Sequence, residues 1–107
     1  LLEWLNHSIF PAEARLADAA FAAGAARVWC ERLIAVGTTT SLVFGSAFPV
    51  AQEALFREYH KRGLRAVIGR GIQTTGPDAA LPLVTTEDRA IKLVEAEIQN
   101  DFGLRAC

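Results

Sequence analysis

The chain has 107 residues, of which 51% are hydrophobic and 21% are charged, with a formal net charge of −1 at pH 7. This length supports one modest hydrophobic core, and the composition is typical of a globular protein rather than a disordered one. The near-neutral charge balance lacks the basic surface of nucleic-acid-binding proteins, so we expect no nucleic-acid partner. No stretch approaches the roughly 20 apolar residues of a membrane span, so we expect no membrane association.

The use of cysteine and methionine adds two expectations. Cys30 and Cys107 stand far apart, which predicts neither a disulfide framework nor a thiolate metal cluster and favours two free thiols in a reducing cytoplasm. The chain contains no methionine, and its first four residues lack the basic segment and apolar core of a signal peptide. We therefore expect a cytoplasmic protein whose chain begins inside a longer gene product.

The N-terminal third predicts two helical segments. Residues 2–9 favour helical turns that end at Phe10-Pro11, because proline biases the preceding residue away from the helical region. Residues 12–36 predict a second helix that is slackened at Gly24, and Asp18 near a plausible start suits the positive end of a helix dipole. Its apolar face, read from spacings of three and four, consists of Phe21, Ala25, Val28, Trp29, Arg32, Leu33 and Val36.

The rest of the chain predicts two strands that alternate with helices. Gly37 can end the preceding helix by adopting positive φ, and the β-branched residues 38–44 follow as a strand. Pro49 suits the first position of a helix over 50–62, which Gly63 stops before a second strand at 64–69. A polar loop over 73–85 leads to Thr86, which can cap a last helix to about residue 99.

The order of these elements predicts an α/β fold with a parallel strand pair. Two consecutive strands joined by one helix should be parallel, since the connection crosses over between them. Two strands alone make a poor sheet, because a parallel sheet needs neighbours at its edges and helices on both faces. We therefore expect that part of the fold lies outside this chain.

Few residues carry chemistry that can be identified from their pattern alone. His7 and His60 give none of the spacings of a zinc site, and His60 suits the negative end of a helix dipole. The phosphate-binding glycine loops and the nucleophile elbow are absent from the sequence. Ser46 follows the first strand and Gln73-Thr74-Thr75 follow the second, so either group can line a pocket or form an ordinary polar loop.

Four segments together resemble the guanine deaminases, a family of the amidohydrolase superfamily. They are Leu2-Glu3-Trp4-Leu5, Phe10-Pro11-Ala12-Glu13 with Arg15, Gly37-Thr38-Thr39-Thr40 and Gly63-Leu64-Arg65-Ala66. The resemblance runs from residue 1 to about 70, and more weakly through the last helix. It implies that residues 1–107 are a fragment of one metal-dependent (β/α)₈ TIM barrel, holding about two β/α units from after the first barrel strand through the third strand and its helix.

The resemblance also implies a reaction and a cofactor. The parent protein would be a hydrolase that removes an exocyclic amine from a purine-like ring as ammonia, with zinc supplying hydroxide near neutral pH. Family members take their zinc ligands from segments that this chain does not contain. We therefore assign no catalytic residue and no metal ligand here, expect no zinc on this chain alone, and expect the isolated chain to be inactive.

Two positions depart from the family and define the candidate pocket. Phe48 stands where family members often have histidine, and Gln73-Thr74 stand where they commonly have Met-Asp. Both positions face the substrate end of the barrel, so the departures weigh against guanine itself and leave a related ring as the expected substrate. The pocket candidates are Phe10, Glu13, Phe48 and Gln73.

Other interpretations stay open at this point. The chain can be a non-enzymatic α/β interaction module that binds a partner through its strand edges, or an inactive truncated fragment. A third is a small flavodoxin-like phosphate or nucleotide binder, which would need a glycine-rich loop that this sequence does not contain. The expected partner is a small purine-like molecule, and association into a homo-oligomer is left open.

Overall fold

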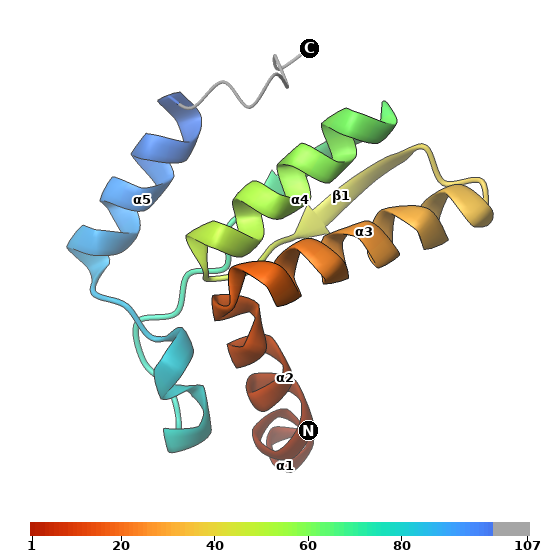
Figure 1. Ribbon diagram of the computed structural model, residues 1–107. Helices are drawn as coiled ribbons and strands as arrows, with labels where there is room; N and C mark the ends of the chain where they lie inside the picture. The colour runs from red at the N-terminus through yellow and green to blue at the C-terminus, as the bar shows by residue number, and fades with distance from the viewer. Residues whose placement is uncertain (100–107) are drawn as a thin grey trace.

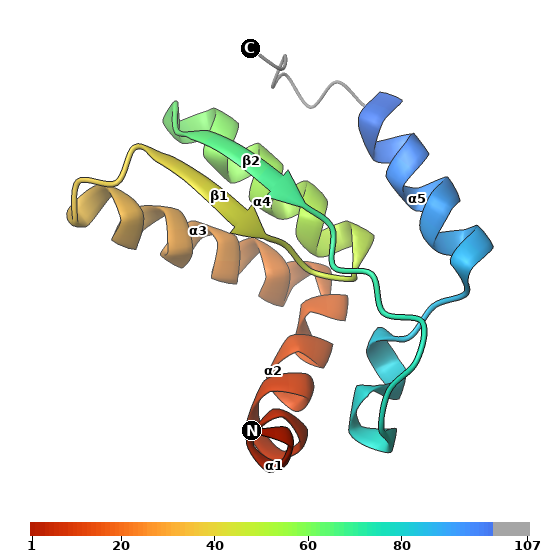
Figure 2. The same ribbon diagram turned by 180° about the vertical axis from the view of Figure 1, so that it is seen from behind.

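The computed structural model describes residues 1–99, which form a mixed α/β arrangement that is mostly helical (Figure 1). Helices pack on one face of a two-stranded parallel sheet (Figure 2). In chain order the elements are α1 (Leu2–Trp4), the π-helix η1 (Leu5–Ile9), α2 (Phe10–Ala14), the 3₁₀ helix η2 (Arg15–Ala17), α3 (Ala19–Ala35), β1 (Thr40–Phe44), α4 (Pro49–Arg62), β2 (Arg65–Gly69), the 3₁₀ helix η3 (Asp78–Leu83) and α5 (Glu87–Gln99).

The N-terminal segment stays helical through Pro11, so the predicted break at Phe10-Pro11 is wrong. Phe10 keeps helical angles, with φ −60° and ψ −42°, and its N–H donates to the Leu5 carbonyl in the wider π-helical pattern. A π turn next to a proline changes the hydrogen-bond pattern where the proline has no N–H to contribute. The chain leaves the helix at Asp18 instead, where φ is −81° and ψ is 121°.

α3 begins at a side-chain cap and runs without interruption. The Asp18 carboxylate accepts a hydrogen bond of 2.7 Å from the N–H of Phe21, which satisfies one of the free donors at the helix start. Gly24 lies inside the helix, so the expected slackening there is wrong. The predicted position of Asp18 at the start of this helix is confirmed.

The apolar face predicted for α3 is largely wrong. Its buried residues are Ala22, Ala26 and Cys30. By contrast, the larger predicted side chains Val28, Trp29, Arg32 and Val36 are exposed. α3 packs against α4, and small side chains in the contact let the two helix axes approach closely. The spacing of the large hydrophobic residues therefore predicted the wrong face of α3 as the buried one.

Glycines in the left-handed region end both long helices, as predicted. Gly37 has φ 79° after α3 and Gly63 has φ 68° after α4. After α4, the Gly63 N–H donates to the His60 carbonyl at 3.1 Å and the Leu64 N–H to the Tyr59 carbonyl at 3.0 Å. These bonds close the last helical turn and direct the chain into the next strand.

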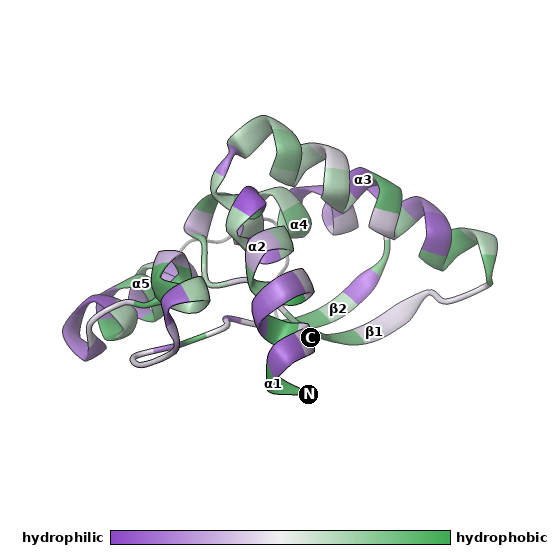
Figure 3. Cartoon of the chain, turned by 90° about the horizontal axis from the view of Figure 1, so that it is seen from below, coloured by the Kyte–Doolittle hydropathy of each residue, from purple (hydrophilic) through white to green (hydrophobic). Residues whose placement is uncertain are grey.

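The two strands pair in parallel, which confirms the predicted topology. The register aligns Thr40 with Arg65 and Phe44 with Gly69. Both strands are shorter than the predicted 38–44 and 64–69, because the residues after each glycine still belong to the turn. Helices α3 and α4 cover one face of the pair, as Figures 2 and 3 show from two directions.

The other face of the sheet is bare within residues 1–99. Leu42, Phe44 and Val67 point to that side and are 84%, 91% and 67% exposed. Alternate residues point toward the helices, where Val43, Ala66 and Ile68 pack against the core. The exposed strand residues are apolar, which is unusual for a face in contact with water.

The core lies between the sheet and the two long helices. Cys30, Tyr59 and Leu64 form its buried centre. The Tyr59 hydroxyl accepts a hydrogen bond of 3.0 Å from Trp29 Nε1 and shares one of 2.8 Å with Ser41 Oγ. This hydroxyl therefore links α3, α4 and β1 at one buried point.

Replacing Tyr59 by phenylalanine should lower the free energy of unfolding by about 1–2 kcal/mol. The ring still fills the core, but two hydrogen bonds are lost, and each contributes about 1 kcal/mol. Trp29 is partly exposed and can donate to water instead, which limits the loss. Urea unfolding of the two proteins measures the difference, and an unchanged midpoint would show that the hydroxyl network does not stabilise the fold.

The C-terminal part adds a 3₁₀ helix that the sequence did not predict. η3 lies inside the predicted loop 73–85 and packs against α2. α5 has the predicted bounds, and its first turn is capped by Thr86 Oγ1, which accepts from the Arg89 N–H at 3.4 Å. Cys107 lies outside the described residues. Among the described residues, no helix combines the length and apolar character needed to cross a membrane.

Candidate functional site

The candidate site lies at the carboxyl ends of the two strands. Because β1 and β2 are parallel, both end at the same edge, and the loops after them share that edge with α2 and η3 (Figure 2). This end of parallel strands is where α/β proteins place their ligand sites.

The loop after β1 is held by hydrogen bonds along its whole length. The Gly45 N–H donates to the Gly69 carbonyl at 2.7 Å, and the Ser46 carbonyl accepts from the Gly71 N–H at 3.3 Å. Ser46 Oγ accepts from the Phe48 N–H at 3.3 Å, just before α4 begins. These bonds tie the loop to the end of β2 and the residues after it, and they close the turn between Ser46 and Phe48.

Gln52 is the buried polar residue beneath this loop. Its side chain comes from the first turns of α4 and is 1% exposed. Its Oε1 accepts from the Ser46 N–H at 3.1 Å, and its own backbone N–H donates to the Phe48 carbonyl at 3.1 Å. A Cβ on Gly45 would lie 2.0 Å from this Oε1, so only glycine lets the loop come so close.

Arg70 holds the same loop from the side of β2. Its side chain is 4% exposed and forms an ion pair with Glu97 of α5, which is 19% exposed. Nε donates to Glu97 Oε2 at 3.1 Å, and Nη1 donates to the Ala47 carbonyl. One guanidinium therefore ties the loop after β1 to the last helix.

The four predicted pocket residues lie at this end of the sheet, on α2, at the start of α4 and after β2. Phe48 is half-buried at the start of α4 and borders a cavity of about 100 Å³ together with residues of η3 and α5. Phe10 and Glu13 are half-buried on α2, which packs against η3, and Gln73 follows β2, where its carbonyl accepts from the Thr85 N–H at 2.9 Å. None of these three lines the cavity beside Phe48.

Polar groups at the same end have no hydrogen-bond donor in the described part of the chain. Asn6 Oδ1 and Thr85 Oγ1 are buried oxygens of this kind. Thr85 also lines a cavity of about 460 Å³ with Thr74, Thr75 and Thr86. Buried acceptors without donors are rare in folded proteins, so this end is chemically unlike the well-paired core.

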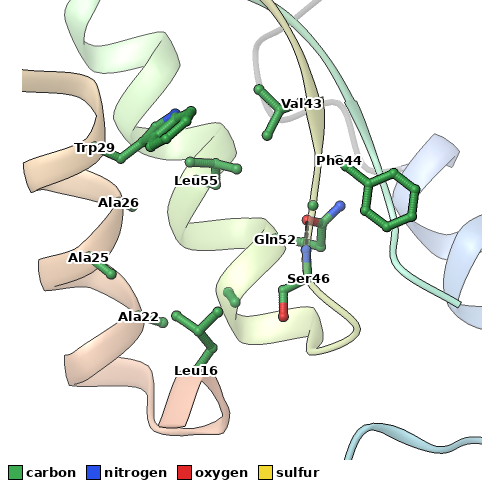
Figure 4. Close-up of a pocket in the computed structure, with 12 residues that line it drawn as sticks. Leu16, Ala22, Ala25, Ala26, Trp29, Val43, Phe44, Ser46, Gln52 and Leu55 are labelled. Atoms are coloured by element: carbon green, nitrogen blue, oxygen red, sulfur yellow. Dashed lines mark hydrogen bonds between the residues drawn. The ribbon is translucent and has the colours of Figure 1, made fainter. Parts of the chain in front are cut away.

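A separate apolar cavity of about 300 Å³ lies on the helix side of the sheet (Figure 4). Ala22, Ala26 and Trp29 of α3 border it on one side, and Leu55 of α4 and Val43 of β1 border it on others. It offers little polar chemistry, because the Ser46 and Gln52 side chains at its edge already form the hydrogen bonds described above.

The residues that the structure describes do not fit a zinc ion. No group of three or more histidine, cysteine, aspartate and glutamate side chains in residues 1–99 is placed to hold a metal. His7 Nδ1 lies 2.9 Å from the Glu3 carbonyl, and His60 is exposed near the end of α4. Burial raises the pKa of the Cys30 thiol, which keeps it protonated and a poor ligand.

Sequence reasoning missed Gln52 and Arg70, the two residues that hold the loop. Gln52 stands one turn before Leu55 on a helix face that is otherwise apolar, which is a usable signal for a buried polar group. Arg70 stands between Gly69 and Gly71, and this local pattern does not indicate a buried ion pair. Its partner Glu97 lies 27 residues further along the chain, and no local pattern connects the two.

Comparison with known proteins finds deaminases. Over 96% of its length the chain is 44% identical to a probable guanine deaminase of Deinococcus radiodurans, of which it covers 23%. It is 39% identical over 65% of its length to the guanine deaminase of Escherichia coli, covering 16% of it. It is 36% identical over 79% of its length to a 5-methylthioadenosine/S-adenosylhomocysteine deaminase of Halobacterium salinarum, covering 19% of it.

Comparison with solved structures also finds a guanine deaminase. The chain matches the solved structure of E. coli guanine deaminase with a TM-score of 0.84 and 32% sequence identity, covering 92% of this chain and 23% of that one. No protein-family model matches the chain. The chain thus spans about a quarter or less of the length of these relatives.

Proposed function

Because the chain is homologous to a segment of the guanine deaminases, we propose that it is part of a hydrolytic deaminase that acts on a purine-like ring. The observation that carries the proposal is the 44% identity over 105 residues. In the proposed reaction, water adds its oxygen to the ring carbon that bears the amine, the carbon–nitrogen bond breaks, and ammonia leaves. The ring keeps a carbonyl group in place of the amine.

We further propose that the described residues form two consecutive β/α units of a (β/α)₈ barrel. The parallel register of β1 and β2, the helices on one face only and the bare apolar opposite face support this arrangement. In a barrel that opposite face would point to the packed interior, which accounts for the exposed Leu42, Phe44 and Val67.

In this proposal the chain supplies part of the substrate pocket and none of the metal ligands. Phe48 and Gln73 stand on the loops after β1 and β2, and Phe10 and Glu13 stand on the neighbouring α2. Zinc would belong to the complete protein, with its ligands in other segments, because residues 1–99 offer no ligand set. The 107 residues alone would therefore be inactive.

Two substrate classes are compatible with the homologues. Two of the relatives named above are guanine deaminases, and the third is a deaminase of 5-methylthioadenosine and S-adenosylhomocysteine. Phe48 places an aromatic ring beside the site, and Gln73 brings a neutral carboxamide, which can both donate and accept hydrogen bonds. We propose a purine-like ring related to guanine, with the sugar-bearing purines as the second candidate.

The test is an assay of the complete protein with zinc. Incubation with guanine, adenine and 5′-methylthioadenosine should release ammonia from at least one of them and convert that ring to its oxo form, as followed by ultraviolet absorbance. The 107-residue chain under the same conditions should release none. Absence of ammonia from every purine with the complete protein would favour the non-enzymatic interaction module instead.

A further inference from the structure

We propose that Gln52 is a positioning residue that holds residues 45–48 and, through Phe48, sets which purine-like ring the site accepts. This inference rests on the proposed deaminase function for its second part. Its first part, the holding of the loop, concerns the fold alone and is tested separately.

The chemistry of Gln52 is unusual for its position. A carboxamide that is 1% exposed costs free energy unless its polar atoms are paired, and packing alone would be served by leucine or methionine. Its Oε1 accepts from the Ser46 N–H at 3.1 Å, and it occupies the space that the missing Cβ of Gly45 leaves open. The loop and the glutamine therefore fit one another in both shape and hydrogen bonding.

The Gln52 side chain bonds to the loop at Ser46, and Ser46 connects it to Phe48. While this side chain holds Ser46, the Gln52 backbone N–H donates to the Phe48 carbonyl at 3.1 Å. Ser46 Oγ in turn accepts from the Phe48 N–H. The Gln52 side chain is therefore linked to the Phe48 N–H through Ser46, whereas the bond to the Phe48 carbonyl is a backbone bond of the first turn of α4 that any residue at position 52 would make.

The position of Phe48 makes this coupling relevant to substrate choice. The residue lies at the carboxyl end of the sheet and borders the cavity formed with η3 and α5. A displacement of about 1 Å in a residue that positions a substrate can lower the rate by about 100-fold. A loop without its central hydrogen bond would present the aromatic ring less accurately.

The experiment compares four variants of the complete protein: Gln52→Met, Gln52→Glu, Phe48→Ala and the double variant Gln52→Met with Phe48→Ala. Methionine keeps the length but removes the acceptor, so kcat/KM for the preferred purine should fall between about 10- and 100-fold. Glutamate keeps an acceptor oxygen and should restore most of the loss. If Gln52 acts through Phe48, the double variant should be no worse than Phe48→Ala alone.

Tyr59→Phe is the matched control, because it removes a buried hydrogen-bonding group from α4 far from the loop. It should lower stability without changing the KM for any purine. Hydrogen exchange gives a readout that needs no activity: the Ser46 amide should exchange faster in Gln52→Met and not in Tyr59→Phe.

Each outcome decides a definite point. Unchanged Ser46 exchange in Gln52→Met overturns the proposed holding of the loop. The coupling through Phe48 is overturned if the losses of kcat/KM from Gln52→Met and Phe48→Ala multiply in the double variant. It is also overturned if Gln52→Met, like Tyr59→Phe, lowers stability without changing the kinetics. If the wild-type protein deaminates no purine, the proposed function and the substrate part of the inference fail together, while hydrogen exchange still decides the loop.

Discussion

Replacing Gly45 by alanine is expected to cost about 3 kcal/mol or more and to disrupt the loop after β1. The added Cβ would lie 2.0 Å from Gln52 Oε1 and 2.5 Å from the carbonyl oxygen of Gly69. The glutamine can move only by giving up its hydrogen bond to Ser46, and the carbonyl belongs to the neighbouring strand. Overpacking of this kind costs about 1–3 kcal/mol when side chains yield, and more when backbone must move.

Gly24→Ala is the matched control for this prediction. It makes the same change inside α3, where a Cβ would meet nothing within 4 Å, and it should stabilise the helix by about 0.5–1 kcal/mol. Denaturant unfolding of the two variants and the parent measures both effects. Equal stabilities for Gly45→Ala and the parent would mean that the loop has room the structure does not show.

The features that the sequence predicted well are those decided by neighbouring residues. Gly37 and Gly63 end their helices with positive φ because no other residue adopts that conformation so readily, and the start of α5 follows from its cap at Thr86. The parallel pairing of β1 and β2 follows from a single intervening helix. Each of these predictions rests on residues within or directly beside the elements concerned.

The predictions that failed depend on contacts between distant segments. The break expected at Phe10-Pro11 is replaced by a π turn, in a segment that packs onto η3 about 70 residues later. The face of α3 is chosen by its fit to α4, which favours the small Ala22 and Ala26 over the larger Val28. Local hydrophobicity carries no information about either contact.

The candidate site also combines features that neighbouring residues decide with features that depend on contacts between separate segments. That Phe48 and Gln73 lie at one end of the sheet could be expected, because both follow parallel strands. The contacts that hold the loop of residues 45–48 could not be predicted, because Gln52 bonds to Ser46 six residues earlier and Arg70 bonds to the distant Glu97. The resemblance to guanine deaminases predicted where the site would lie, whereas the contacts that support its loop required the structure.

Replacing Arg70 by methionine is expected to lower the free energy of unfolding by about 3 kcal/mol. The guanidinium is nearly inaccessible, and removing it leaves the partly buried Glu97 carboxylate and the Ala47 carbonyl without their donors. Loss of one partner from a buried ion pair costs about 3–5 kcal/mol, because the remaining charge is uncompensated. The lower end applies here, since Glu97 retains some contact with water.

Arg57→Met is the control for the loss of an arginine in an ion pair. Arg57 and its partner Glu53 are 73% and 42% exposed, so the change should cost less than about 1 kcal/mol. The double variant Arg70→Met with Glu97→Leu should recover part of the lost free energy of unfolding. It removes the Glu97 carboxylate together with the Arg70 guanidinium, so no buried charge is left without a partner. A single Arg70→Met variant that unfolds at the same denaturant concentration as Arg57→Met would show that the pair does not anchor α5. Recovery in the double variant would locate the cost in the unpaired carboxylate rather than in lost packing, so the pair would fix where α5 and the loop after β1 meet.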